Sequence, residues 1–213
     1  MLEINVDKKI IIRKANQNDD LERISELIYN VDPYIYPYWF ENLENCKKIL
    51  PKLILEDNFI FNIETIYIAI NSDNNEIVGL SSIVDKYSIS EYDYEKLSTN
   101  KDNIKYTIEN YIKPMIENIK TKNIATITNM CVKKEYRNMH IGYKLLKTVI
   151  GEYMNNNNDN DVEYIEFGVL AHNPSAIKLY KNLGFVQISD IEKGFNGNNM
   201  EKPEVILMSL KIK

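Results

Sequence analysis

The chain has 213 residues, of which 44% are hydrophobic and 27% charged, with only 7 Gly and 6 Pro. This composition is that of an ordinary globular protein, and it excludes collagen-like and low-complexity disordered chains. Asp and Glu (31) outnumber Lys and Arg (26), so the net charge of −5 disfavours a general nucleic-acid-binding surface, which requires a basic face.

The two cysteines, Cys46 and Cys131, lie far apart and form neither a CxxC pair nor a metal-ligand spacing. A secreted disulfide scaffold, a zinc ribbon and a redox dithiol are therefore disfavoured, and no metal is expected. No apolar run approaches the roughly 18–20 residues that cross a membrane, and the N-terminus lacks the apolar core of a signal peptide. We therefore expect a cytoplasmic protein without a membrane partner, folded as one domain over residues 1–213.

The first part of the chain predicts a strand followed by two helices. The β-branched run 9–14 precedes polar capping residues and then apolar side chains at helical spacing over 21–28. The aromatic segment 32–40 contains two prolines and predicts a loop. Residues 41–55 predict a second helix, which Pro51 breaks late.

A β-hairpin and a helical insertion come next. Two β-rich runs, 65–70 and 76–83, flank a cluster of turn residues and predict an antiparallel pair. Residues 85–123 are charged and rich in tyrosine, with a helical pattern that Pro114 interrupts. We interpret this segment as a helical insertion in the domain.

The rest of the chain alternates strands and helices. Strand patterns at 125–132 and 163–170 are each followed by a helical pattern, at 141–154 and 174–182. The last two strands are predicted at 185–188 and 204–210, so seven strands are expected in all.

A small basic region lies between residues 133 and 147, where five Lys or Arg side chains accompany one Glu. It joins the strand that ends at Val132 to a helix that begins near Ile141. Unpaired N–H groups and the positive end of the helix dipole meet at such a start, which suits a phosphate or pyrophosphate, and Gly142 allows close backbone approach. The segment is neither a Walker loop nor a Rossmann fingerprint. A solvated helix face is the alternative interpretation of the charge.

A second group of residues surrounds the helix that begins at 174. Asn173 and Pro174 are typical of a helix start, and Gly184 is typical of a helix end. Tyr180 follows Asn173 by two helical turns, so both side chains lie on nearly the same face and can address one ligand. Capping and core packing are the alternative roles of these residues.

Together, the two segments resemble the GNAT superfamily of acetyl-CoA-dependent N-acetyltransferases. That family's pyrophosphate loop reads Arg/Gln-x-x-Gly-x-Gly/Ala, of which Arg137 and Gly142 supply the first and last residues. The family's later signature, Asn-x-x-Ala-x-x-x-Tyr-x-x-x-Gly-Phe, is matched by Asn173, Ala176, Tyr180, Gly184 and Phe185. The resemblance implies an α/β (α+β) fold with a mixed, mostly antiparallel seven-stranded sheet, a splayed central strand pair and helices on both faces.

His140 stands where the family has a glycine. Its Cβ is compatible with the loop if the residue keeps a negative φ and its ring turns away from the phosphate. We therefore expect His140 to contribute its backbone only.

The resemblance also implies where acetyl-CoA binds. Backbone groups of Met130, Cys131 and Val132 would pair with the pantetheine amides, and an N–H there would hold the thioester carbonyl oxygen. The Cys131 side chain is expected to be an inert, buried thiol. The cofactor-binding set is completed by Arg137, Asn138, Met139, His140, Ile141, Gly142, Tyr143, Lys144, Asn173 and Ala176.

Acetyl transfer to an amine requires a neutral nitrogen, a stabilised oxyanion and a proton for the departing thiolate. Tyr180 is the expected catalytic residue, because a phenol with a pKa of about 10 is protonated at neutral pH and its family counterpart points at the CoA sulfur. No Glu lies in 125–132, so the base is left as a water relay, His172 or carboxylates of the insertion.

The acceptor is expected to be a primary amine bound between the aromatic segment 32–40 and the tyrosines and carboxylates of 87–95. Packing of these aromatics in the core is the equally weighted alternative. The expected reaction is direct transfer from acetyl-CoA through a ternary complex. A non-catalytic acyl-CoA sensor or silent subunit of the same fold is the alternative function, and a homodimer is left open.

Overall fold

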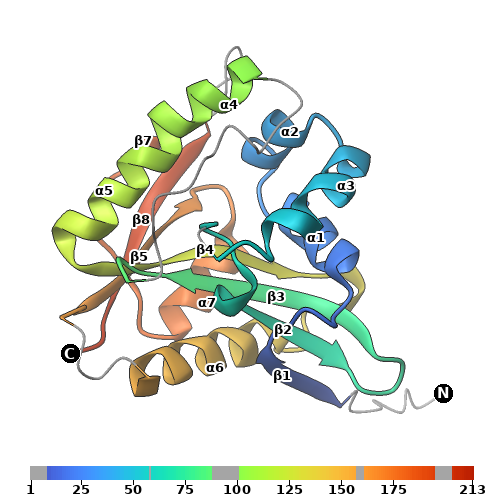
Figure 1. Cartoon of the computed structure of the whole chain (residues 1–213). Coiled ribbons are helices and arrows are strands. Elements are labelled where there is room, and N and C mark those ends of the chain that lie inside the picture. Colours follow the sequence, from blue (N-terminus) through green and yellow to red (C-terminus); the bar gives the residue numbers. More distant parts are fainter. Residues whose placement is uncertain (1–8, 58, 88–100, 157–160, 195–202) are drawn as a thin grey trace.

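The computed structural model describes residues 9–57, 59–87, 101–156, 161–194 and 203–213. These residues form a mixed sheet with helices packed against both of its faces (Figure 1). Among them, no helix combines the length and the apolar character needed to cross a membrane.

Within the described part of the chain, the sheet has eight strands in the order β1-β2-β3-β4-β5-β8-β6, and β7 also pairs with β8. In the described residues the central pair β4–β5 is parallel and the other pairs are antiparallel. The strands are β1 (Ile10–Lys14), β2 (Ile66–Asn71), β3 (Glu76–Val84), β4 (Ile124–Val132), β5 (Tyr164–Leu170), β6 (Val186–Gln187), β7 (Glu192–Lys193) and β8 (Glu204–Lys211). The mixed, mostly antiparallel sheet is confirmed, but the count of seven strands was wrong, because β7 is too short to leave an alternating pattern in the sequence.

The helices divide between the two faces of the sheet. One face is covered by α1 (Leu21–Tyr29), α2 (Ile35–Phe40), α3 (Leu43–Leu53), α4 (Lys101–Thr107) and α5 (Lys113–Lys122), and the other by α6 (Ile141–Asn156) and α7 (Pro174–Asn182). Each face has its own hydrophobic core, because side chains alternate between the faces along a strand. Leu80 and Ile124 belong to the first core, and Ile165 and Phe167 to the second.

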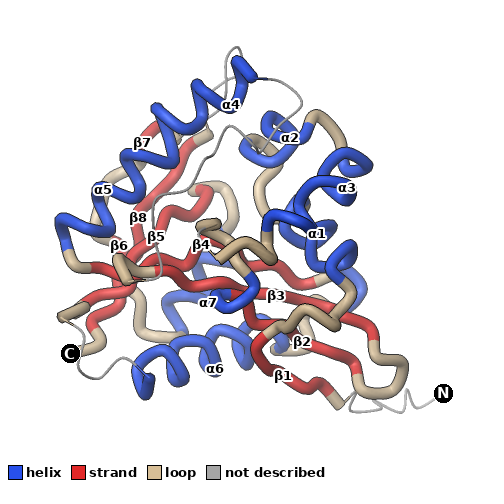
Figure 2. Tube along the Cα trace, viewed as in Figure 1, coloured by secondary structure: helices blue, strands red, loops and turns tan. Residues whose placement is uncertain are grey.

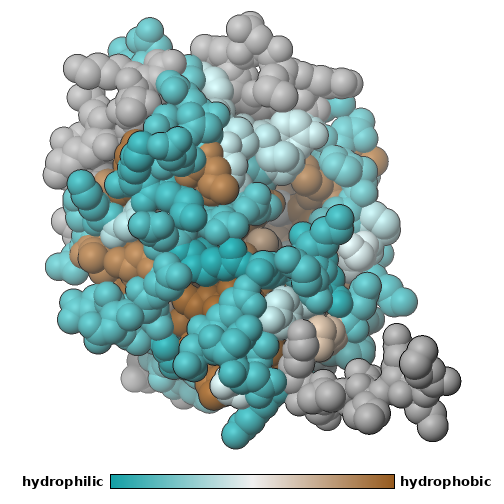
Figure 3. All heavy atoms as spheres, turned by 90° about the vertical axis from the view of Figure 1, so that its right-hand side faces the viewer, coloured by the Kyte–Doolittle hydropathy of each residue, from teal (hydrophilic) through white to brown (hydrophobic). Residues whose placement is uncertain are grey.

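The side of the molecule that carries α1 and α3 is mostly hydrophilic, with small apolar areas between the polar side chains (Figure 3). The apolar sides of these helices face inward. Ile24 and Leu27 of α1 and Cys46 of α3 are buried in the first core.

The aromatic segment 32–40, expected to be a loop, contains the helix α2. Its Pro37 lies in the first helical turn, where N–H groups have no partner within the helix, so the missing N–H costs nothing. Asp32 satisfies two N–H groups near the start of this helix, those of Tyr34 (2.7 Å) and Ile35 (2.9 Å). The proline therefore marks a helix start rather than a loop.

Two other prolines are accommodated inside helical stretches. The helix α3 contains Pro51 and continues to Leu53. In the expected insertion, α4 and α5 form one long helical stretch along an edge of the molecule (Figure 2), joined by the π-helical turn η3 (Ile108–Ile112). The Lys113 N–H donates to the Ile108 carbonyl oxygen, five residues back. The interruption predicted at Pro114 thus takes the form of this wider turn.

The parallel strands β4 and β5 pair only at their first residues. Ile124 pairs with Tyr164 and Ala125 with Ile165, and the two strands separate beyond that point. A register shift on the β3 side leaves Thr128 as an extra residue between Ile127 and Asn129, a β-bulge that re-aims the rest of β4. The predicted splay of the central strand pair is confirmed, and it opens the middle of the sheet.

Candidate functional site

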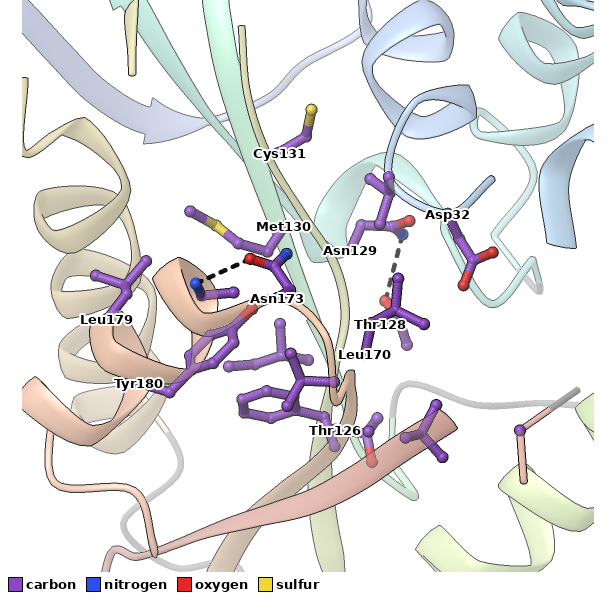
Figure 4. Close-up of a pocket in the computed structure, with 18 of the residues that line it drawn as sticks. Asp32, Thr126, Thr128, Asn129, Met130, Cys131, Leu170, Asn173, Leu179 and Tyr180 are labelled. Atoms are coloured by element: carbon purple, nitrogen blue, oxygen red, sulfur yellow. Dashed lines mark hydrogen bonds between the residues drawn. The ribbon is translucent and has the colours of Figure 1, made fainter. Parts of the chain in front are cut away.

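A cleft of about 1300 Å³ opens where β4 and β5 separate. One wall, called here the α6–α7 wall, is formed by residues from the segments 137–143 and 173–180. The opposite wall, called the α2–α5 wall, consists of residues 30–36 and 106–118. Figure 4 shows β4 running between side chains of both walls.

The cleft edge of β4 offers backbone groups rather than a second strand. The Lys133 N–H donates to the Val78 carbonyl oxygen of β3 (2.8 Å). Since alternate residues of a strand bond to alternate neighbours, the peptide groups of Met130 and Val132 turn to the β5 side, where pairing has ended. Arg137 Nε donates to the Val132 carbonyl oxygen (3.1 Å) and joins the loop to this edge.

Cys131 does not present its thiol to the cleft interior. It pairs with Leu80 of β3, and its sulfur points away from Tyr180 and Asn173 (Figure 4). Burial raises the pKa of the thiol, so it is protonated at neutral pH and is a poor nucleophile. These features agree with an inert, buried cysteine.

The loop before α6 turns sharply at two residues with left-handed backbones. Asn138 has a φ of 63° and His140 a φ of 55°. The expectation of a negative φ at His140 was therefore wrong. Asn and His enter this region more readily than most residues with a Cβ, so the turn forms without the family's glycine.

The loop delivers the start of α6 to the cleft. The His140 carbonyl oxygen accepts the Lys144 N–H (3.0 Å), which makes His140 the residue that opens the helix. The next N–H groups, those of Ile141, Gly142 and Tyr143, belong to the first helical turn and have no acceptor within the helix. This arrangement suits an anion.

Gly142 has a packing role that sequence reasoning did not identify. A Cβ at this position would lie 3.0 Å from Met130 Cε and 3.3 Å from Leu179 Cδ2. The glycine therefore lets the start of α6 lie close against β4 and α7, at the floor of the cleft.

Most of the predicted cofactor-binding residues line this cleft, and two do not. Met139 packs in a small separate core with Tyr136 and Ile141. Lys144 lies on the exposed side of α6, beside a shallow depression that Lys147 also lines. The residues that do line the cleft are Met130, Cys131, Val132, Arg137, Asn138, His140, Ile141, Gly142, Tyr143, Asn173 and Ala176.

Asn173 and Tyr180 meet on the α6–α7 wall. The Asn173 side chain caps α7, since its Oδ1 accepts the Ala176 N–H (3.1 Å). The Tyr180 ring packs edge-on against Phe167 (4.5 Å between centroids), and its hydroxyl points toward Asn173 (Figure 4). Burial raises the pKa of Tyr180, so the phenol carries its proton at neutral pH. The arrangement can donate a proton inside the cleft.

The α2–α5 wall overlaps only in part with the expected acceptor region. Asp32, Ile35 and Tyr36 line the cleft, whereas Trp39 and Phe40 are buried in the first core. The tyrosines contributed by the helical stretch are Tyr106 and Tyr111.

The other expected acceptor and base residues lie elsewhere. Tyr87 is exposed and does not line the cleft, and its hydroxyl donates to Asp161 (2.9 Å), so the cleft gives its assignment to the acceptor site no support. Residues 88–95 lie outside the described part of the chain. His172 is exposed and does not line the cleft.

Sequence reasoning missed Asn129 of β4, whose side chain links α2 to β3 by hydrogen bonds. The Tyr36 hydroxyl donates to Asn129 Oδ1 (2.5 Å), and Asn129 Nδ2 donates to Ser82 Oγ (2.9 Å). Asn129 is buried beside the bulge at Thr128. An Asn within an otherwise β-rich run was the available signal.

The charged groups of the described residues do not form a metal site. No group of three or more His, Cys, Asp or Glu side chains in this part of the chain is placed to hold a metal ion.

Residues 33–185 match the sequence model of a family described as "Acetyltransferase (GNAT) family". No curated protein matches the chain in sequence. Among solved structures, Arabidopsis thaliana NAA60 in complex with a bisubstrate analogue has a TM-score of 0.57 and 20% identity, over 96% of this chain and 100% of that chain.

Two further solved structures resemble this chain to a similar degree. Mutant forms of the spermidine/spermine N-acetyltransferase SpeG from Vibrio cholerae have a TM-score of 0.59 and 17% identity, over 95% of this chain and 94% of that chain. A chain of the NatC complex bound to Gag peptide and CoA has a TM-score of 0.58 and 13% identity, over 95% of this chain and 98% of that chain. At these identities the likeness establishes a shared fold.

Proposed function

Because the chain belongs to the GNAT family of acetyltransferases, we propose that it transfers the acetyl group of acetyl-CoA directly to a primary amine within a ternary complex. The observation that carries the proposal is the open edge of β4, which lies beside the first turn of α6 and near the Tyr180 phenol. That combination offers backbone partners for amides, N–H groups for a pyrophosphate and a proton donor in one cleft. The NatC structure, whose chain shares this fold, contains CoA.

In this proposal the α6–α7 wall binds acetyl-CoA. The pantetheine amides pair with the peptide groups of Met130 and Val132, as an added strand would. The pyrophosphate binds the first-turn N–H groups of α6 from Ile141 to Tyr143, where the helix dipole is positive. Arg137 adds positive charge beside this position.

The transfer itself needs few groups from the protein. The alkylammonium form of the amine first loses a proton to water. Its neutral nitrogen then attacks the thioester carbonyl carbon, and a C–N bond forms while an N–H on the β4 edge holds the oxyanion. The C–S bond then breaks, its electron pair goes to sulfur, and the thiolate takes the proton of the Tyr180 hydroxyl. The phenolate is reprotonated by the proton that the nitrogen loses.

A thiol-release assay with a panel of primary amines tests the proposal. We expect CoA to appear only when an amine is present, together with an equal amount of acetylated amine. If the protein binds acetyl-CoA but releases no thiol with any amine, it is an acyl-CoA sensor or a silent subunit and the proposed activity is wrong.

A further inference from the structure

The α2–α5 wall carries a carboxyl group that acetyl-CoA binding does not use. Asp32 lies in the turn between α1 and α2, and it lines the cleft with Tyr36 and Tyr111. Figure 4 shows its carboxyl group on the side of β4 opposite Tyr180. A substrate that enters past Asp32 would therefore approach the splayed strands from the side opposite the α6–α7 wall.

The Asp32 carboxyl group is only partly satisfied. Its Oδ1 accepts the N–H groups of Tyr34 (2.7 Å) and Ile35 (2.9 Å), and no Lys, Arg or His of the described residues forms an ion pair with it. Burial raises the pKa of Asp32, and burial also raises the pKa of Tyr36 and Tyr111, with a smaller contribution from the Asp32 charge. All three residues line the same cleft. Burying a carboxylate without a cation costs stability, which a functional role would explain.

Most charged side chains that line the cleft are divided between its two sides; Glu192 and Lys193 of β7 also line it, and Lys193 pairs with Glu204 (3.1 Å). Arg137 and Lys178 belong to the α6–α7 wall. Asp32 and Glu166 lie toward the other side, because Glu166 alternates along β5 with Phe167, which packs in the second core. The α6–α7 wall thus favours an anion, and the opposite side favours a cation.

We infer, on the basis of the proposed acetyltransferase function, that Asp32 binds the positive charge of the acceptor, which is therefore a cationic alkylamine rather than an aryl amine or an alcohol. Tyr36 and Tyr111 also line the cleft, and aromatic rings attract alkylammonium groups. Asp32 is thus a specificity-determining residue of the acceptor side.

The direct test compares the wild-type protein with Asp32→Asn, each as its CoA complex, by calorimetric titration with butylamine, putrescine and aniline. Asn keeps an Oδ1 for the two backbone N–H groups but has no charge. Loss of a charge-assisted hydrogen bond should weaken binding of the two alkylamines about 10- to 100-fold. Aniline, which is uncharged at neutral pH, should bind weakly and equally to both proteins.

A matched control removes the same charge from an exposed position. Asp73→Asn lies in the turn between β2 and β3, outside the cleft, and should leave butylamine binding unchanged. Equal butylamine affinity for the wild-type protein and Asp32→Asn would overturn the inference, as would tight binding of aniline to the wild-type protein.

Kinetics and stability separate this inference from the proposed function. If the wild-type protein acetylates butylamine, Asp32→Asn should raise the KM for the amine while leaving the KM for acetyl-CoA unchanged. Because the folded-state pKa of Asp32 is raised, its ionised form destabilises the fold at neutral pH, so this variant should not have a lower Tm. If the protein binds the alkylamine through Asp32 but releases no thiol, charge recognition by Asp32 is supported and the proposed acetyl transfer is refuted.

If Asp32→Asn does not fold, a competition experiment with the wild-type protein tests the charge recognition instead. Butyltrimethylammonium, which cannot be acetylated, should compete with butylamine for binding, and butanol should not. Failure of this cation to compete would refute the charge recognition.

Discussion

The two walls of the cleft are built by different means. The α6–α7 wall comes from two short segments of the chain, and what it offers to a ligand is mainly backbone N–H groups at a helix start and one phenol. The α2–α5 wall joins segments that lie far apart in the sequence, and it offers side chains, among them those of Asp32, Tyr36 and Tyr111. A site made of backbone groups needs a local turn and a helix start, which leave a motif. A site made of side chains depends on how distant segments pack together, and such packing leaves no sequence motif.

The Tyr180 hydroxyl is the proton donor that the α6–α7 wall adds to its backbone groups, and its removal should have the largest effect. Tyr180→Phe keeps the ring contacts with Phe167 and Phe185, so the packing survives. We expect turnover to fall about 100- to 10,000-fold, the usual range for loss of a general acid, with unchanged acetyl-CoA affinity. Thiol release and calorimetry measure the two quantities. Equal losses in both would make Tyr180 an anchor for acetyl-CoA, and wild-type turnover would remove it from the chemistry.

The close packing at the start of α6 can be broken at Gly142. A Cβ there meets Met130 and Leu179 at 3.0–3.3 Å, so Gly142→Val should displace the helix start or the β4 edge. Overpacking of this kind costs about 1–3 kcal/mol, and we expect acetyl-CoA to bind about 10- to 100-fold more weakly.

Gly151→Val is the matched control, because Gly151 lies in the same helix and a Cβ there meets no atom within 4 Å. Its acetyl-CoA affinity should equal that of the wild-type protein. If both variants or neither variant lose affinity, the start of α6 is not the acetyl-CoA site.

The link between α2 and β4 depends on Asn129. Asn129→Ala leaves the buried Tyr36 hydroxyl without its acceptor, whereas Ser82 loses the Asn129 donor but keeps its hydrogen bond with Thr128 (2.7 Å). An unsatisfied buried group costs about 1–3 kcal/mol, which urea denaturation should register as a lower free energy of unfolding. Asn129→Asp keeps an acceptor for the Tyr36 hydroxyl. It should therefore lose less affinity for the amine than Asn129→Ala loses. A greater effect on acetyl-CoA than on the amine would contradict the division between the walls.

The smallest effect is expected outside both walls, at the ion pair between Arg13 of β1 and Asp19 before α1. Arg13 holds the pKa of Asp19 below its usual value, so the pair stabilises the fold above pH about 4 and loses this contribution as the pH falls through the lowered pKa. The Arg13 side chain is 40% exposed, so we expect Asp19→Asn to lower the free energy of unfolding by about 1 kcal/mol or less at neutral pH.

The difference between Asp19→Asn and the wild-type protein should disappear in acid, as measured by urea denaturation across pH. The KM values for amine and acetyl-CoA should not change. A difference that persists undiminished in acid would assign the effect to something other than the ion pair.

The departures from the sequence-based predictions have identifiable physical causes. Pro37 indicated a loop, but the first turn of a helix does not use the N–H that proline lacks. His140 was expected to avoid a positive φ, but the loop between β4 and α6 requires two left-handed residues and the chain supplies Asn and His there. The assignment of Tyr87 to the acceptor site relied on the residue composition of its segment, and composition does not say which way a side chain points.

The sequence by itself determined the features that depend on neighbours along the chain. Apolar periods of two and about 3.6 residues predicted the long strands and helices, and Asn173 with Pro174 predicted the start of α7. The GNAT resemblance, confirmed by the family match, came from two such local segments. Only the tertiary structure decided where β4 leaves β5, that the bulge at Thr128 re-aims β4, and that Asp32 faces the cleft beside Tyr111. These depend on which segments pack together, and packing energy is shared among residues too distant in sequence to leave a pattern.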